Sequence, residues 1–317
     1  MMQQNYYGKI ILVTGGTGSI GSEIVRQLIH CRPKQLRIFS RDESKQYQLQ
    51  KELEKFESMV DLRYLIGDVR DKERLKVAMD RVNIIYHAAA MKHVPFCEYN
   101  PFEAIKTNVT GTQNVIEAAI DHGVEKVIAI STDKAVEPNT VMGITKLLME
   151  RMVISSKAYV GIRKTKMSVV RFGNVLNSRG SVIPTWIEQI DSGGPVTVTN
   201  KDMRRFFMSI PEAVDMVLEA TSAMLGQEIF ILKMKELNIY ELAQEIIRTH
   251  GNGKDIPIQI VGSREREKNT ELLFTEEEKK TMIDMGKYYM ILPNTELYEE
   301  RKKMYSLRPT DIVFPIV

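Results

Sequence analysis

Three glycines, Gly15, Gly18 and Gly21, constrain the fold of this chain more than any other feature. An apolar run at residues 10–13 precedes them, and an amphipathic stretch from residue 22 follows. Glycines at this spacing allow a tight turn and a close approach to a ligand, and the start of a helix offers free N–H groups to an anion. The segment therefore predicts a strand, a dinucleotide-binding turn and a helix. The predicted cofactor residues of the turn are Gly15, Thr17, Gly18, Ser19, Ile20 and Gly21.

Short apolar runs alternate with longer amphipathic stretches through the first half of the chain. The expected strands are residues 10–13, 36–39, 62–66, 84–87, 127–130 and 168–171. The expected helices are residues 22–30, 45–56, 71–80, 101–122 and 141–156. Because short apolar runs separated by helices are typical of buried parallel strands, we predict an α/β fold with a doubly wound parallel (Rossmann) sheet.

The pattern loosens after about residue 174 and then returns to a helix at 210–225 and a strand at 228–232. We therefore predict a dinucleotide-binding domain of residues 1–175 plus about 210–236. A smaller C-terminal substrate-binding lobe would comprise about residues 176–209 plus 237–317. The charge clusters at 276–280 and 299–303 are typical of solvated helix faces.

Composition excludes several classes of protein. The chain has 44 Lys and Arg against 41 Asp and Glu, so it lacks the basic excess of a nucleic-acid-binding protein. It has no apolar run of about 18 residues, and we expect no membrane insertion. Cys31 and Cys97 have neither disulfide-framework nor metal-ligand spacing. We expect a cytoplasmic protein without a metal.

The T-G-x-x-G-x-x-G spacing resembles the short-chain dehydrogenase/reductase superfamily, and the chain length suggests its extended branch. A carboxylate at the end of the second strand commonly binds the ribose of NAD, but this chain has Ser40 and Arg41 there. A guanidinium and a neutral donor suit a 2′-phosphate, so we predict NADP, with NAD as the alternative. The resemblance implies that the further cofactor contacts are Asp68, Val69, Ala88, Ala89, Ala90 and Asn108.

The predicted catalytic residues follow the fifth strand. Thr132, Asp133 and Lys134 come directly after it, and Met142 and Lys146 stand where most members of the superfamily have Y-x-x-x-K. Lys146 can still bind the ribose, but a thioether cannot transfer a proton. This leaves either a non-catalytic NADP-binding regulatory protein or an enzyme with other acid and base groups. The ionisable pair at a strand end favours the enzyme.

Several segments closely resemble the UDP-N-acetylhexosamine 4,6-dehydratases of bacterial polysaccharide and glycan biosynthesis. They are residues 66–71, 87–95, 106–112, 131–136, 142–146, 171–175, 180–184 and 193–199. The resemblance implies that hydride leaves sugar C4, water is lost across C5 and C6, and hydride returns to C6. It also implies that Lys134 is the base at C5, Asp133 the acid at the C6 hydroxyl, and Thr132 a partner of the C4 oxygen. Asp133 or an ordered water would remove the C4 hydroxyl proton.

The resemblance further implies a UDP-sugar substrate, UDP-N-acetylglucosamine, and a lyase that we expect to be a homo-oligomer. The substrate-binding residues it implies are Lys92, His93, Asn174, Ser181, Val182, Arg205, Arg264 and Glu267. The chain departs from the family pattern at Arg204, where threonine is common, and at Arg266, where glycine is usual. Residues 18–23, 139–143 and 193–195 look more like the branch that retains the C5 configuration. The alternatives are an inverting dehydratase and a 4-epimerase, which usually keeps the tyrosine.

Overall fold

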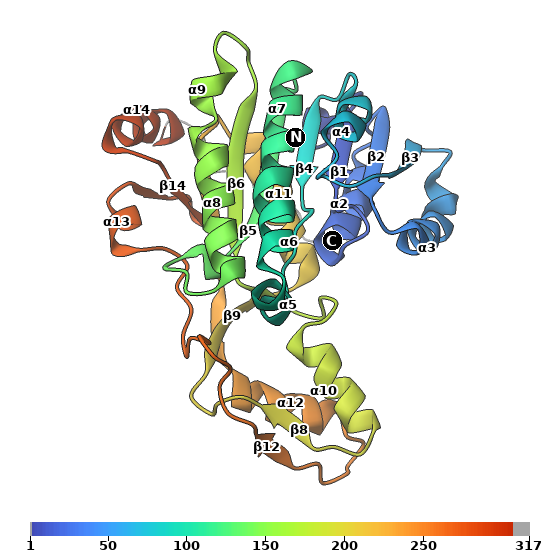
Figure 1. The fold of residues 1–317 in the computed structure, drawn as a ribbon, viewed down its shortest axis with the longest axis vertical. Coiled ribbons are helices and arrows are strands. Elements are labelled where there is room, and N and C mark those ends of the chain that lie inside the picture. The colour runs from blue at the N-terminus through green and yellow to red at the C-terminus, as the bar shows by residue number, and fades with distance from the viewer. Residues whose placement is uncertain (1, 307–317) are drawn as a thin grey trace.

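The computed structural model describes residues 2–306, and nine strands of this part form the central sheet (Figure 1). Their order is β13-β14-β10-β6-β5-β4-β1-β2-β3, with parallel neighbours from β10 to β3 and antiparallel pairing at β14 and β13. The strands are β1 (Ile10–Thr14), β2 (Gln35–Ser40), β3 (Asp61–Ile66), β4 (Ile84–His87), β5 (Lys126–Thr132), β6 (Lys166–Phe172), β10 (Ile229–Leu232), β13 (Met282–Asp284) and β14 (Tyr288–Ile291). The prediction of a doubly wound α/β sheet is confirmed.

Helices cover both faces of this sheet. The apolar sides of α2, α3 and α11 pack into the core on one face, and those of α4, α7 and α8 into the core on the other. The helices of this domain are α1 (Met2–Tyr6), α2 (Ser19–His30), α3 (Glu43–Leu53), α4 (Lys72–Met79), α5 (Val94–Tyr99), α6 (Pro101–Ile105), α7 (Gly111–Asp121), α8 (Val141–Ser155), α9 (Lys157–Val160), α11 (Ile210–Ala223), α13 (Glu276–Lys279) and α14 (Thr295–Ser306). The expected helix at 101–122 is α6 and α7 joined by a π-helical turn, Lys106–Thr110. Turns of 3-10 helix occupy Glu54–Phe56 and Asp133–Ala135.

A smaller lobe lies below the carboxyl ends of the strands in Figure 1. It contains a three-stranded sheet and a two-stranded sheet, beside two helices that pack around the buried Trp186. Its elements are β7 (Asn174–Val175), α10 (Val182–Asp191), β8 (Val196–Val198), β9 (Arg204–Met208), β11 (Lys235–Asn238), α12 (Ile239–His250) and β12 (Ile258–Ile260). The lobe has an apolar core of its own, separate from the two cores that flank the large sheet.

The C-terminal segment differs from the expected domain division, which assigned all of 237–317 to the smaller lobe. Residues 282–291 form β13 and β14, and β14 pairs with β10 at the edge of the large sheet. Met290 and Ile291 are buried in its cores. These strands are three and four residues long, too short to produce a clear apolar pattern in the sequence. Residues 307–317, which the prediction also assigned to the smaller lobe, lie outside the described residues.

A buried charged cluster joins β6, α8 and α13. Arg171 on β6 donates hydrogen bonds to both carboxylate oxygens of Glu150, both of Glu278, and the Leu273 carbonyl. Burial opposes the charge on Arg171, but the two carboxylates outweigh it and raise its pKa. The prediction that the charged cluster at 276–280 is solvated is therefore wrong for Glu278. Its side chain is 12% exposed because it faces this arginine.

Candidate active site

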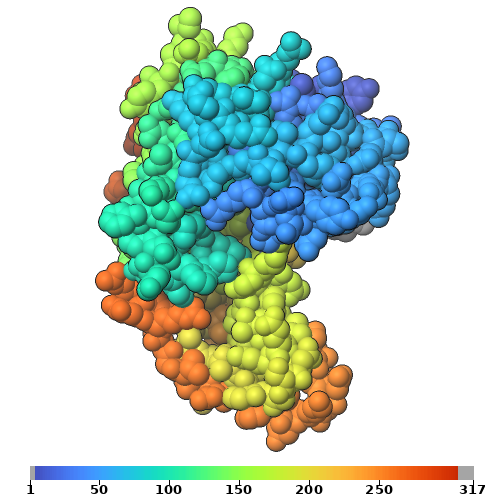
Figure 2. Space-filling view, turned by 45° about the vertical axis from the view of Figure 1, so that its right-hand side comes forward, coloured from blue at the N-terminus to red at the C-terminus, as the bar shows by residue number. Residues whose placement is uncertain are grey.

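A cleft of about 1150 Å³ separates the sheet from the smaller lobe. In Figure 2 it is visible as a hollow between the blue and green body and the yellow and orange lobe. Its walls come from the glycine turn, the segments that follow β4, β5 and β6, the start of α10, and residues 261–268. Segments far apart in the sequence therefore meet at the carboxyl ends of the parallel strands, where ligands bind in this class of sheet.

The glycine turn has the shape that a pyrophosphate group requires. Gly15 has φ +66°, and a Cβ atom there would lie 2.7 Å from the backbone nitrogen of Ala89. A Cβ atom at Gly21 would lie 2.3 Å from the Gly15 carbonyl oxygen. Gly18, Ser19, Ile20 and Gly21 line the cleft at the N-terminus of α2, and Ala88 and Ala90 line it from the segment that follows β4. These residues fit a dinucleotide, because bulkier side chains would fill the cradle.

Side chains after β2 and β3 are arranged around the predicted ribose position. Ser40 is buried, and its hydroxyl forms a 2.7 Å hydrogen bond with the Thr17 hydroxyl. Arg41 lines the cleft with its side chain 61% exposed and lies 3.5 Å from the carboxylate of Asp68. Burial would raise the pKa of Asp68, but hydrogen bonds from Arg70 outweigh burial and lower it. Arg41, although ion-paired with Asp68, is thus the cation of this set whose side chain lines the cleft and is mostly exposed.

Asn108 and Val69, predicted as cofactor contacts, pack inside the protein. The Asn108 amide bonds to both backbone polar groups of Met91 and to the Thr145 hydroxyl. Val69 is buried against Gly111, where a Cβ atom would lie 2.7 Å from its side chain. Asn108 thus holds the loop after β4, and Val69 packs against α7, roles for which the residue type alone gives no signal.

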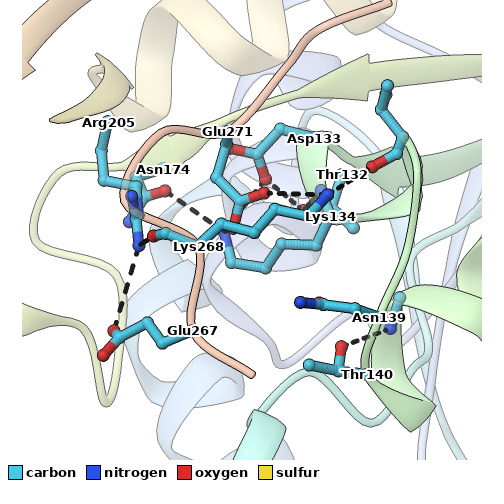
Figure 3. Close-up of polar contacts among 12 residues, drawn as sticks. Thr132, Asp133, Lys134, Asn139, Thr140, Asn174, Arg205, Glu267, Lys268 and Glu271 are labelled. Carbon is cyan, nitrogen blue, oxygen red and sulfur yellow. Dashed lines mark hydrogen bonds and ion pairs between the residues drawn. The ribbon is translucent and has the colours of Figure 1, made fainter. Parts of the chain in front are cut away.

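Three of the predicted catalytic residues, Thr132, Asp133 and Lys134, meet at the end of β5, as Figure 3 shows. Oδ1 of Asp133 accepts hydrogen bonds from the Lys134 amine at 3.0 Å and from the Thr132 hydroxyl at 2.9 Å. Lys134 and Thr132 line the cleft, whereas Asp133 is fully buried beneath them, and its Oδ2 has no hydrogen-bond partner. A buried carboxylate in contact with two cleft-lining donors is suited to proton transfer through them.

Lys146 and Met142 lie on one face of α8, as their spacing predicts, and both line the cleft. The Lys146 amine is buried and donates a 2.5 Å hydrogen bond to the Ile130 carbonyl. Burial lowers the pKa of Lys146 to about 8, against a smaller opposite effect of Glu150. Met142 packs with Cys97 and Ala104 in a small apolar cluster. The tyrosine position of the superfamily is therefore apolar here.

The start of α10 forms the far wall of the cleft. Ser181 and Val182 line it, and the Ser181 hydroxyl is buried without a hydrogen-bond partner. Asn174 follows β6, and its side-chain oxygen lies 3.5 Å from the Lys134 amine. Ser181 and Val182 thus lie at a helix N-terminus, a site suited to an anionic group, whereas Asn174 lies beside Lys134.

Lys92 and His93 line the cleft on the loop after β4. The pKa of Lys92 is lowered by desolvation and then by the charge of Arg179. The pKa of His93 is lowered by desolvation and then by Lys92. The His93 ring packs where a Cβ atom on Gly180 would stand, because that atom would lie 2.4 Å from the ring. This contact positions the loop against the turn before α10.

Residues 264–268 fold back toward β5 and are held by Arg205. The Arg205 guanidinium is buried and donates to the carbonyls of Arg204, Lys268 and Asn269. Arg205 also lines the cleft, so these bonds anchor the segment while the predicted role of Arg205 as a phosphate ligand stays a prediction. Arg264 and Glu267 line the cleft, and the Glu267 carboxylate accepts from the Arg264 backbone nitrogen.

Glu271 is a candidate site residue that the sequence motifs do not identify. It lines the cleft, is 6% exposed, and places Oε1 3.8 Å from the Lys134 amine (Figure 3). The position is separated from Lys134 by more than 130 residues, and its neighbours 272–274 are apolar. A lone acid at the start of an apolar run is the signal that could have drawn attention to it.

The fold is of the short-chain dehydrogenase/reductase type. Residues 11–293 match the model of the family described as polysaccharide biosynthesis protein, and the chain belongs to that family. The match includes both the cofactor turn and the segment that carries Glu271.

Relatives with similar sequences have differing names. An uncharacterized membrane protein of Methanocaldococcus jannaschii is 53% identical, over 91% of this chain and 87% of that protein. A Campylobacter jejuni UDP-N-acetylglucosamine 4,6-dehydratase (inverting) is 41% identical, over 93% of this chain and 86% of its own length. A Rickettsia canadensis UDP-glucose 4-epimerase is also 41% identical, over 90% of this chain and 83% of its own length. These names place the chain among relatives of nucleotide-sugar dehydratases and epimerases.

Among solved structures, Pen from Bacillus thuringiensis superposes with a TM-score of 0.88 at 38% identity, covering 96% of this chain and 98% of that one. Among residues 2–306, no helix is both long and apolar enough to span a bilayer.

Proposed function

We propose that this protein is a UDP-N-acetylglucosamine 4,6-dehydratase that forms a UDP-4-keto-6-deoxy-N-acetylhexosamine. The observation that carries the proposal is the hydrogen-bonded group of Thr132, Asp133 and Lys134 at the end of β5, beside an apolar Met142. An enzyme without the tyrosine needs another acid and base, and this group supplies both at the cleft wall. Because the net reaction removes water, the enzyme would be a lyase.

Thr132, Asp133 and Lys134 have different roles in the proton transfers. Lys134 has its amine at the cleft and takes the C5 proton, which is acidic once C4 is a carbonyl. Asp133 is the acid for the departing C6 hydroxyl and, before that, the base for the C4 hydroxyl. Since Asp133 lies beneath the cleft surface, its proton moves through the hydrogen-bonded Thr132 hydroxyl or Lys134 amine. Thr132 also orients the C4 oxygen.

We propose NADP as the cofactor, with NAD as the alternative. When bound, this cofactor would supply hydride-transfer chemistry, as the acceptor of the C4 hydride and the donor of the hydride to C6. The glycine turn and the α2 N-terminus would hold the pyrophosphate, and Lys146 the nearby ribose. Arg41 supports NADP because its exposed guanidinium can pair with a 2′-phosphate, and Lys45 lines the same part of the cleft.

The substrate diphosphate would bind at the start of α10. The unpartnered Ser181 hydroxyl and the helix N–H groups are donors for it, and Arg264 lies across the cleft. Lys92, His93 and Asn174 would surround the sugar.

The configuration at C5 divides the proposal into two products. Residues 18–23, 139–143 and 193–195 favour retention, whereas the Campylobacter relative is named as inverting. The outcome depends on which face of C5 receives the returning proton. We propose retention, with inversion as the alternative.

Incubation with UDP-N-acetylglucosamine in deuterated water, followed by NMR and mass spectrometry, tests the proposal. We expect a 4-keto-6-deoxy product with deuterium at C5, whose coupling constants report its configuration. A C4 epimer formed without loss of water would instead identify a 4-epimerase. Binding of NADP with no 4-keto product would identify a non-catalytic regulatory protein, the alternative that Met142 allows.

A further inference from the structure

Lys134 lies between two carboxylates, although the mechanism above uses only Asp133. Asp133 contacts the amine from β5 at 3.0 Å, and Glu271 faces it from the C-terminal segment at 3.8 Å. Oε2 of Glu271 accepts no hydrogen bond and lies 3.9 Å from the Lys268 amine. A nearly buried carboxylate with an oxygen that accepts no hydrogen bond is costly to desolvate, so its position calls for a functional explanation.

The segment that carries Glu271 is anchored at both ends by buried arginines. On one side, Arg205 bonds to the carbonyls of Lys268 and Asn269. On the other, Arg171 bonds to the carbonyl of Leu273 and to Glu278. Glu271 is therefore fixed between two rigid attachments instead of moving with an exposed loop.

A second set of contacts joins the same segment to the loop after Lys134. The Lys268 amine donates to the carbonyls of Val136 and Glu137 at 2.9 and 2.6 Å. The Asn139 amide donates to the carbonyl of Arg266 at 2.8 Å. These bonds fix the distance between Glu271 and the end of β5, so the contact with Lys134 is built by several elements.

We propose that Glu271 is a positioning residue for Lys134, an inference that rests on the proposed dehydratase activity. When the C5–H bond breaks, its electron pair enters the C4–C5 enolate and then expels the C6 hydroxyl, while the proton forms a new bond to the Lys134 amine. Positive charge thus develops on that amine. Glu271 stabilises this charge and keeps the amine directed at the cleft, while Asp133 remains free to act on the C6 hydroxyl.

Glu271→Gln tests the charge while keeping the shape, and Glu277→Gln is the matched control. Glu277 lies in the same segment, on α13, with its side chain 80% exposed. For Glu271→Gln we expect a kcat and a rate of C5 deuterium incorporation that are lower by roughly 100-fold, the effect of removing one preorganised electrostatic group. KM and cofactor content should match those of the control.

Glu271→Ala with added formate provides a second measurement if the glutamine variant folds poorly. Because the position opens on the cleft, formate can restore a carboxylate beside Lys134 and should recover part of kcat. A glutamine variant with the activity of the control, a loss confined to KM, or an alanine variant that folds but is not rescued by formate would each overturn the inference. If the unmodified protein forms no 4-keto sugar, the proposed function itself fails; if it does, these outcomes concern Glu271 alone.

Discussion

Replacing Lys146 with methionine should change how the stability of the cofactor-free protein depends on pH. Burial lowers the pKa of Lys146 to about 8 from the usual 10.5, so the folded protein binds this proton less tightly than the unfolded chain. At pH 7 the charged amine therefore costs about 3 kcal/mol, because each pKa unit corresponds to about 1.4 kcal/mol. This cost falls as the pH rises from about 8 to about 10.5, so Lys146 favours folding more at high pH.

Methionine has a similar length and removes the titrating group. The variant also loses the hydrogen bond to the Ile130 carbonyl, and an unpaired buried acceptor costs about 1–3 kcal/mol. This second cost does not depend on pH. Between pH 7 and about pH 9.5, the free energy of unfolding of the unmodified protein should therefore rise by about 2 kcal/mol relative to the variant.

Urea denaturation of both proteins at several pH values measures this difference. Lys164→Met, which alters an exposed lysine, is the control and should follow the unmodified protein across the pH range. The reasoning would be refuted if the difference between Lys146→Met and the unmodified protein stayed constant with pH, or if it changed in the opposite direction. The variant should also bind the cofactor more weakly if Lys146 holds its ribose.

Three further predictions concern catalysis, cofactor choice and stability. Asp133→Asn and Lys134→Ala should each abolish formation of the 4-keto sugar and leave the cofactor bound, as product NMR and the cofactor absorbance would show; full activity in either would refute its assigned role. Arg41→Ala should weaken NADP binding by about 10-fold or more in calorimetry with little effect on NAD, since hydrogen bonds to charged groups contribute about 1.5–3 kcal/mol; equal losses for both cofactors would contradict the assignment. Arg171→Leu should lower the free energy of unfolding by about 3–5 kcal/mol, because Glu150 would stay buried without its partner; a loss below about 1 kcal/mol in urea titration would contradict this.

The sequence predicts the sheet well because each buried parallel strand is a short continuous run of apolar residues. Strands β1 to β6, except for short extensions, lie where those runs occur. The position of Lys134 follows from the same reasoning, since residues after parallel strands meet at one edge. The edge strands β13 and β14 are too short and too mixed in polarity for this signal.

Residue type alone does not reveal which partner a polar side chain binds. The sequence predicts Ser40, Asn108 and Arg205 as ligand contacts, but it does not predict the bonds that they form to Thr17, Thr145 and the Lys268 carbonyl. Glu271 shows the opposite case, because its contact with Lys134 depends on folding of a distant segment. Such long-range pairs require the three-dimensional structure.

The segment that ends in β14 both completes the candidate site and covers an edge of the large sheet. β14 covers β10, whose unpaired backbone groups would otherwise form an open edge able to pair with other chains. The stretch just before β13 and β14 carries Glu271 over Lys134. A molecule in which residues 271–291 have not docked therefore lacks a complete site and also exposes the edge of β10, so inactive chains are also the ones most prone to aggregate.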